Sequence, residues 1–364
     1  MTRRTTPRSR ELATASVAAA EAVLADEVAG LVTGEDWRQF LDDQARFYDL
    51  DAHNVLLVVS QHLSAYGQGR VPDPSPTYVA SFDTWKALGR HVERGQHGYT
   101  LLVPGRASDP DARAVPGRSH AAPRGQPSVA AEREAHAPAR HAWRPATVFA
   151  LSQTAGREVE VAVRATLGPG ESPPGLKEAM VALIEARGWT VTTAVDVTTF
   201  DGAHSRPSYR NRCIMVRGDL DDAAMVRALL QGAAHVVLHG DPPGRYLPQA
   251  MKELEAQSVA YVVAAAHAMS SDGASFPDVA DWAGEQAAKA IRTNGARISR
   301  AARAIIAVSP ADHVAGSTPP GADLALAALR RIDQEAAARK AELLDRISGH
   351  EMPAPDVPPG PTLR

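Results

Sequence analysis

The sequence predicts an α+β protein, because two kinds of apolar pattern alternate along its 364 residues. Apolar residues at helical spacing mark several segments, for example Met225 to His239, and short runs such as Tyr99 to Val103 have strand character. Breaks rich in Pro and Gly separate these segments. With 44% hydrophobic residues the chain can bury sizeable cores, and its length suggests two domains with connecting segments.

The first half is predicted to begin with helices. Residues 11–31 form a segment of Ala, Leu and Val that is typical of a helix, and residues 36–61 carry apolar side chains at helical spacing. The second segment predicts two short helices, with Asp36 as a cap. A loop rich in Gly, Pro and Asp follows at 67–76, and a further helix is predicted from about residue 83 to 93.

Two strands are predicted on either side of an insertion. Residues 99–103 and 147–151 both have strand character, so each is the natural partner of the other. Residues 105–142 between them hold almost no large apolar side chains and cannot offset the entropy of ordering, which predicts disorder. Residues 35–160 are therefore predicted to form one domain, preceded by a basic tail and helix at 1–34.

The second half is predicted to form another α+β domain over residues 171–284. Its predicted elements are, in order, a helix at 176–187, a strand at 189–195, a turn-rich stretch at 201–207, a strand at 212–216, and apolar helices at 225–239 and 251–269. Residues 285–364 are predicted to contain a basic helix, a Pro/Gly linker and a charged, exposed helix from Leu324 to Ile347.

Composition limits the classes of function. Acidic residues interrupt the Ala-rich stretch at 12–29, so no signal peptide is expected, and no apolar run is long enough to predict a transmembrane helix. The lone Cys213 excludes an internal disulfide and a cysteine-based zinc cluster, which favours a cytoplasmic location. The net charge of −3 gives no global nucleic-acid signature, so any such function must be local.

The segment from Leu229 to Gly240 has the apolar frame of a metallopeptidase zinc helix without its chemistry. Such a helix needs His-Glu-x-x-His, because histidines at i and i+4 reach one metal while the glutamate deprotonates the bound water. In this chain the frame is Gln231-Gly232-Ala233-Ala234-His235. One ligand and the base are missing, so hydrolysis by the usual route is not expected and the domain is predicted to be a pseudoenzyme.

A shifted zinc pair on the same helix is the alternative. His235 and His239 are four residues apart, but Val236 stands where that frame needs a glutamate. A helix that ends in His-Gly is also common without metal, because histidine suits the last turn and glycine the cap. The main expectation is therefore no cofactor, with a distorted zinc site of His235, His239 and Glu253 kept as an alternative.

Two blocks of motifs, in order along the chain, point to one architecture. The first block consists of Trp37, Phe40-Leu41, Phe47-Tyr48, Asn54-Val-Leu-Leu57, Gln61, Val79-Ala-Ser-Phe82, Trp85, Leu88-Gly-Arg90, Val92, Gly95, Gly98, Leu101-Leu-Val-Pro104 and Val148-Phe-Ala-Leu-Ser-Gln-Thr154. This block resembles the ArdC-like antirestriction proteins. The resemblance implies an N-terminal single-stranded-DNA-binding domain followed by a zincin-like metallopeptidase domain.

The second block resembles the peptidase half of the same family. It consists of Tyr209, Ile214, Leu230-Gln-Gly-Ala-Ala-His235 and Glu253-Leu-Glu-Ala-Gln-Ser-Val-Ala-Tyr261. The resemblance implies that His235 matches the second histidine ligand and Glu253 the third ligand, with Glu255 as the fallback. Gln231 and Gly232 depart from the family pattern, so any metal site here is predicted to be a remnant.

Candidate DNA contacts follow from general chemistry, because single strands are held by aromatic stacking and by Lys or Arg along the phosphates. Lys86, Arg90 and Arg94 fall at i, i+4 and i+8, which predicts one basic stripe on the helix that begins near Trp85. The predicted nucleic-acid-binding residues are Lys86, Arg90, Arg94, Arg46, Tyr48 and Trp85. Aromatic residues are also typical of a core, and residues 35–104 hold six Lys or Arg against nine Asp or Glu.

The leading hypothesis is a cytoplasmic protein that binds single-stranded DNA without sequence preference and carries an inactive metallopeptidase-like domain. Its biological setting, implied by the resemblance alone, is antirestriction or the biology of mobile elements. One alternative is a residual zinc-dependent hydrolase. The other is a protein-interaction scaffold without DNA binding, which the acidic balance of the first half allows. No membrane partner is expected.

Overall fold

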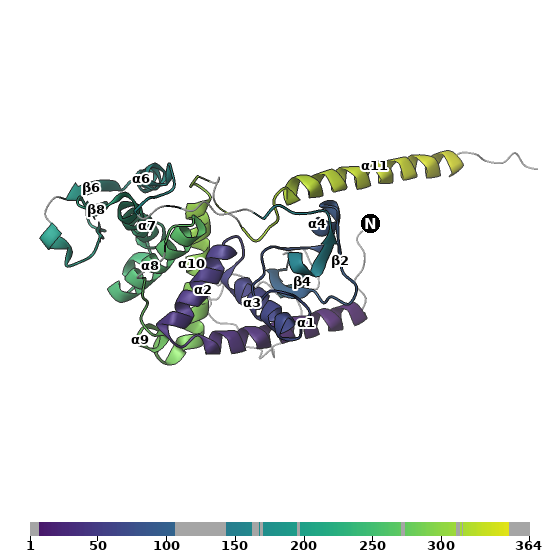
Figure 1. The fold of residues 1–364 in the computed structure, drawn as a ribbon, viewed down its shortest axis with the longest axis horizontal. Helices are drawn as coiled ribbons and strands as arrows, with labels where there is room; N and C mark the ends of the chain where they lie inside the picture. Colours follow the sequence, from purple (N-terminus) through teal and green to yellow (C-terminus); the bar gives the residue numbers. More distant parts are fainter. Residues whose placement is uncertain are drawn as a thin grey trace, which may run out of the picture.

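The computed structural model describes most of the chain, and its arrangement is drawn in Figure 1. The described residues are 7–105, 143–161, 167, 170–194, 197–270, 274–310, 314 and 316–348. The predicted disordered insertion at 105–142 lies outside them except for Gly105. Helices and small sheets alternate along the described chain, which confirms the α+β class.

Three helices open the fold: α1 (Pro7–Gly30), α2 (Gly34–Arg46) and α3 (Ala52–Gly67). A capping box starts α2, because Thr33 Oγ1 accepts from the Asp36 amide at 3.1 Å and Asp36 Oδ2 accepts from the Thr33 amide at 2.8 Å. Asp36 is thus the third residue of the helix, and the prediction that it is the cap itself is wrong by one turn.

The helix predicted at 83–93 is much shorter than expected. It is α4 (Phe82–Ala87), and the chain then turns at Gly89, whose φ of +77° is a left-handed conformation that suits glycine. After the turn, β2 (Arg90–Val92) pairs antiparallel with β5 (Thr154–Gly156). Pairing with a strand far along the chain therefore overrides the local helical spacing.

The strands on either side of the insertion pair as predicted. In the first sheet β4 (Trp143–Ala150) lies between β1 (Val79–Ala80) and β3 (Tyr99–Pro104), and both contacts are antiparallel. Tyr99 faces Val148 in the register. Side chains of α3, of this sheet and of the turn after α2 form a core that includes Phe47, Val55, Val58, Val79, Tyr99 and Leu101.

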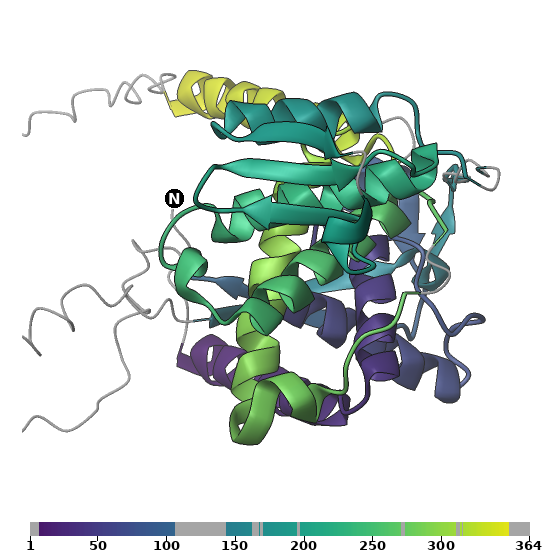
Figure 2. The same cartoon turned by 90° about the vertical axis from the view of Figure 1, so that its left-hand side faces the viewer.

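The second half holds a mixed sheet covered by helices (Figure 2). In chain order its elements are α6 (Leu176–Ala186), β6 (Thr190–Ala194), β7 (Ser205–Ser208), β8 (Cys213–Arg217), α7 (Asp222–His239), η4 (Gly244–Tyr246) and α8 (Gln249–Ala266). Strand β8 pairs parallel with β6 and antiparallel with β7. The sequence predicts only turns where β7 lies. The segment is a strand because it pairs with β8, which lies later in the chain.

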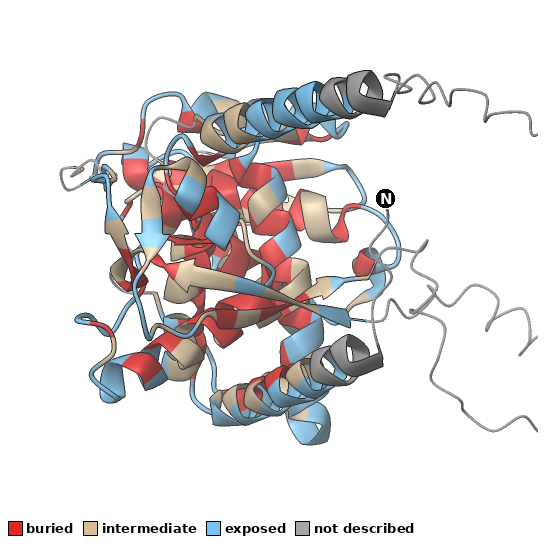
Figure 3. Ribbon diagram, turned by 90° about the vertical axis from the view of Figure 1, so that its right-hand side faces the viewer, coloured by how far each residue is buried: buried red, intermediate tan, exposed pale blue. Residues whose placement is uncertain are grey.

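The last helices differ in their surroundings: α9 (Val279–Ala283), α10 (Ala287–Ile306) and α11 (Ala322–Ser348). Helix α10 buries Ile291, Ile298 and Ile305 and contacts α3, α7 and α8. Helix α11 leaves the body beside α4, and residues 331–341 are exposed (Figures 1 and 3). In the described chain no helix has both the length and the apolar character needed to cross a membrane.

One core joins elements from both halves. It includes Trp37 from α2 together with apolar residues of α7, α8 and α10. Two hydrogen bonds add to the contact between α2 and α8, from Trp37 Nε1 to Ser258 Oγ at 3.1 Å and from Tyr261 Oη to Asp42 Oδ1 at 2.7 Å. The domain limits predicted from the sequence stay predictions.

Candidate functional site

The degenerate zinc frame lies between α7 and α8, where His235 is fully buried. Its Nδ1 is 3.0 Å from Tyr209 Oη, and its Nε2 is 3.3 Å from Glu253 Oε2 without the alignment of a hydrogen bond. Burial, and then the nearby carboxylate of Glu253, raise the pKa of Tyr209 well above its usual range. Tyr209 therefore stays protonated and fixes the orientation of the His235 ring.

Gln231 stands one helical turn before His235, where a zinc helix has its first ligand. Its Nε2 donates to Glu253 Oε2 at 3.2 Å, and Gln249 Nε2 donates to Glu253 Oε1 at 2.6 Å. Burial alone would raise the pKa of Glu253, but the neighbouring imidazole and the two amides outweigh it, so the pKa lies below its usual value. Amide groups thus stabilise this carboxylate.

Gly232 stands where a metallopeptidase has its catalytic glutamate, and the structure shows why no side chain fits there. A Cβ on Gly232 would lie 2.7 Å from Ile214 Cγ2, because α7 packs directly on β8 at this point. This distance is shorter than side-chain carbons tolerate. A glutamate at position 232 would require the Ile214 side chain or β8 to shift.

A second group, in which His239 and Glu255 are fully buried and Arg297 is partly exposed, lies one turn further along α7. His239 Nε2 is 2.8 Å from Glu255 Oε2, and Arg297 of α10 donates to both oxygens of Glu255, from Nε at 2.6 Å and from Nη2 at 3.0 Å. Burial raises the pKa of Glu255, but the bonds from His239 and Arg297 outweigh it and leave the pKa below its usual value. Burial lowers the pKa of His239.

These contacts do not fit a zinc ion, which needs about three protein ligands. The His235 and His239 ring centroids are 5.6 Å apart, but His239 Nε2 bonds to Glu255, which Arg297 also holds, and not to Glu253. In the parts of the chain that the structure describes, no three His, Cys, Asp or Glu side chains are grouped to hold a metal ion. The zinc site of His235, His239 and Glu253 stays a prediction.

The predicted basic stripe in the first half is not formed. Lys86 lies exposed on α4 and Arg94 lies exposed after β2, but Arg90 is in the strand between them. The Arg90 guanidinium bonds to Thr154 Oγ1 at 2.8 Å and also to the carbonyls of Thr154 and Arg157. Arg90 thus connects β2 to the chain around β5, and the prediction of one helical face is wrong.

The other predicted DNA contacts are placed as follows. Trp85 is fully buried and its Nε1 donates to the Phe149 carbonyl at 2.9 Å, so it belongs to the core and has no face for a base. Tyr48 is half-buried, and burial raises its pKa. Arg46 lies 3.6 Å from the carboxylate of Asp43.

Two exposed aromatic side chains were not identified from the sequence. Trp143, 40% exposed at the start of β4, packs on His53 with ring centroids 4.9 Å apart. Tyr246, 77% exposed, ends η4. The two aromatic residues Phe82 and Tyr66 are also exposed. Strand alternation could have placed Trp143 on the outer face, but no local signal distinguishes Tyr246 from a core residue.

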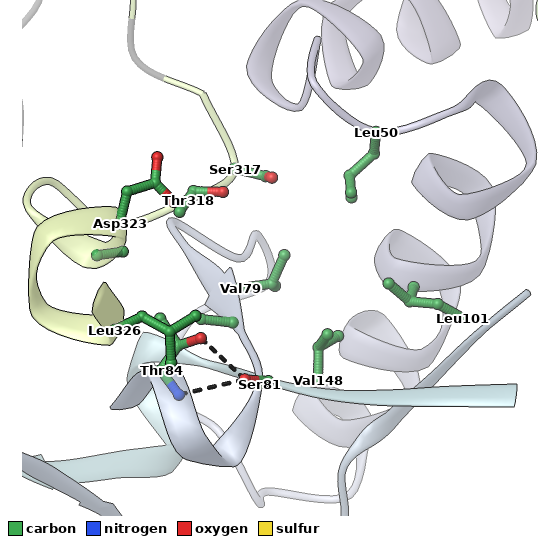
Figure 4. A pocket seen from close by; sticks show the side chains of 12 residues that line it. Leu50, Val79, Ser81, Thr84, Leu101, Val148, Ser317, Thr318, Asp323 and Leu326 are labelled. Atoms are coloured by element: carbon green, nitrogen blue, oxygen red, sulfur yellow. Dashed lines mark hydrogen bonds between the residues drawn. The ribbon is translucent and has the colours of Figure 1, made fainter. Parts of the chain in front are cut away.

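A cavity of about 280 Å³ lies between the first sheet and the start of α11 (Figure 4). Its walls are mostly apolar, and the polar groups around it belong to Ser81, Thr84, Ser317, Thr318 and Asp323. Because the lining includes a carboxylate and no Lys or Arg, the cavity does not fit a phosphate group.

The solved structures that are similar to this chain include two crystal structures of the antirestriction protein ArdC from plasmid R388. The Mn(II)-bound structure shares 17% identity with this chain, and the TM-score is 0.41. The match covers 70% of this chain and 85% of the ArdC chain. The metal-free structure shares 18% identity with this chain, and the TM-score is 0.39. The match covers 72% of this chain and 84% of the ArdC chain. No protein-family model and no curated protein match the chain.

Proposed function

We propose that the chain binds single-stranded DNA without sequence preference, in an antirestriction or mobile-element setting. The observation that carries the proposal is the ordered set of motifs from Trp37 to Thr154, which resembles the single-stranded-DNA-binding domain of ArdC-like proteins. Exposed aromatic residues such as Trp143 support it, because bases stack on aromatic rings whatever their sequence.

The second half acts in this proposal as a scaffold that does not hydrolyse peptides. Gln231 and Gly232 replace a ligand and the base, and the packing of Gly232 on Ile214 leaves no room for a glutamate. The group of His239, Glu255 and Arg297 joins three helices through bonds between side chains. Both observations favour a structural role for this half.

Titration of a labelled, mixed-sequence single-stranded oligonucleotide with the full-length protein tests the proposal. Fluorescence anisotropy should show binding at low salt that weakens as salt rises, with log Kobs falling by about 0.7 per phosphate contact for each unit of log salt. A duplex of the same sequence should bind more weakly, because its bases are not free to stack. No binding of the single strand at low salt would contradict the proposal and favour the interaction scaffold.

Zinc analysis tests the scaffold half separately. Protein purified in metal-free buffer and then incubated with zinc should retain less than one equivalent after desalting, because His235 and Glu253 alone make too few ligands. One equivalent of retained zinc, lost in a His235→Ala variant, would instead favour the residual hydrolase.

A further inference from the structure

The fold gathers positive charge at a place that the sequence did not indicate. Four arginines lie exposed around the turn between β7 and β8 and the loop after α7, together with the exposed Tyr246. We call this surface the arginine rim, and its residues are Arg187, Arg210, Arg212, Arg245 and Tyr246. These residues are spread over sixty positions of the sequence, so no local charge pattern reveals the surface.

Side-chain contacts hold the segments of the arginine rim together. Arg212 Nη2 donates to the Arg187 carbonyl at 3.0 Å, and its guanidinium carbon lies 5.7 Å from the centre of the Trp189 ring. Arg245 Nη2 donates to the Tyr209 carbonyl at 3.4 Å. The turn after β7, the end of α6 and the loop after α7 are therefore neighbours.

The charge of the arginine rim is only partly balanced. Arg212 lies 3.8 Å from Asp241, an exposed pair of the kind that contributes little. Among the described residues, the guanidinium groups of Arg187 and Arg210 have no carboxylate within ion-pair distance. Beneath the rim, Lys252 Nζ lies 4.4 Å from the centre of the Tyr209 ring, and the carboxylate of Glu253 lies near the same tyrosine, so these two charges offset each other.

Tyr246 adds an exposed aromatic residue to the segment that carries Arg245. It is 77% exposed and directly follows Arg245. Exposed aromatic rings and arginines on one surface suit a single strand, since bases stack on rings and phosphates pair with arginines. Binding of an acidic peptide would need only the positive charges and not the exposed aromatic ring.

We infer that the arginine rim binds the phosphates and one base of a single-stranded nucleic acid. This inference rests on the proposed function and places part of the DNA contact in the second half of the chain. In the first half, Arg90 is tied to Thr154 and Arg157, and residues 35–104 carry more acidic than basic side chains. The arginine rim adds cations to those that the first half exposes, Lys86 and Arg94 among them.

A charge-reversal pair tests the phosphate contacts. The Arg187→Glu/Arg210→Glu variant should bind a labelled single-stranded oligonucleotide at least tenfold more weakly than the unaltered protein. Its salt slope should be smaller by about 1.4, because each lost phosphate contact removes about 0.7. The Arg330→Glu/Arg331→Glu variant is the matched control, since it changes the net charge equally on the exposed helix α11, on the opposite side of the molecule (Figure 1).

Tyrosine variants test the stacking. Tyr246→Ala should weaken binding about tenfold, whereas Tyr246→Phe, which keeps the ring, should bind as the unaltered protein does. All variants should keep the same unfolding temperature, because the replaced side chains are exposed.

The outcomes separate the two proposals. Absence of binding by the unaltered protein at low salt contradicts the proposed function itself. Binding that is unchanged in Arg187→Glu/Arg210→Glu, or that falls equally in the α11 control, overturns the arginine rim and leaves the proposed function standing. Displacement of the oligonucleotide by polyglutamate as efficiently as by an unlabelled strand would assign the rim to an acidic protein instead.

Discussion

At the scale of single residues, the structure explains two departures from the metallopeptidase pattern by different means. Gln231 takes the place of a metal ligand and uses its amide to stabilise Glu253. Gly232 takes the place of the base and lets α7 approach Ile214 of β8. The sequence identifies both departures directly, but the close contact that depends on Gly232 involves Ile214, eighteen residues earlier in the chain, and needs the structure.

Gly232→Glu is expected to destabilise the protein by at least about 2 kcal/mol, because overpacking and a buried carboxylate both cost free energy. Chemical denaturation of this variant beside Gln231→His measures the effect. Gln231→His should destabilise the protein less than Gly232→Glu, since position 231 is only half-buried. Equal stability of Gly232→Glu and the unaltered protein would show that β8 adjusts freely to a side chain at this position.

Asp43 predicts a pH dependence of stability. Burial raises its pKa to about 6, while Arg46 lowers it by a smaller amount. Because the folded pKa lies above the unfolded value, the contribution of Asp43 is fully present at low pH and is lost as pH rises from about 4 to 6. The free energy of unfolding of Asp43→Asn, relative to that of the unaltered protein, should therefore rise by roughly 2 to 3 kcal/mol between pH 4 and 7, because each pKa unit is worth 1.36 kcal/mol.

Urea denaturation at several pH values measures this difference. The free energy of unfolding of Asp43→Asn minus that of the unaltered protein should rise over this range. A constant difference from pH 4 to 7 would show that Asp43 titrates alike in the folded and unfolded states.

At the scale of secondary structure, the sequence predicts elements well where one pattern dominates. The long helices α1, α7 and α8 and the pairing of β3 with β4 follow from periodicity and from the break between the strands. Prediction fails where a partner far along the chain decides the local structure. Gly89 ends α4 so that β2 can reach β5, and β7 is a strand only because β8 lies beside it.

Three helices meet at the buried carboxylate of Glu255, which bonds to His239 of α7 and Arg297 of α10. Arg297→Met is expected to lower the free energy of unfolding by about 3 to 5 kcal/mol, because it leaves the buried Glu255 carboxylate without its main partner. Arg300→Met, one turn away and exposed, should change stability by less than about 0.5 kcal/mol. Denaturant unfolding compares the two, and similar losses in both would show that Arg297 matters only for surface charge.

At the scale of the whole molecule, the two halves share a core although their sequences resemble separate domains. Trp37 of α2 is fully buried and bonds to Ser258 of α8, and α10 packs on helices of both halves. The sequence shows α10 as basic and amphipathic, but it gives no sign of which surfaces its apolar face covers.

The shared core predicts that both halves unfold together. Tryptophan fluorescence reports on Trp85 in the first half and Trp189 in the second, and far-ultraviolet circular dichroism reports on all helices. Their denaturant transitions should coincide in one step, as in a two-state protein. Two separate transitions, or midpoints that differ between the probes, would show that the halves are independent in stability.

The contact between Arg297 and Glu255 also bears on how the stability of the fold depends on metal ions. A fold stabilised by a bound ion gains free energy that depends on the free ion concentration and falls when a chelator removes the ion. Here the positive group is part of the chain, so it cannot dissociate and its local concentration does not change on dilution. This part of the fold should therefore hold equally well in cells that are short of divalent cations and in cells that have plenty.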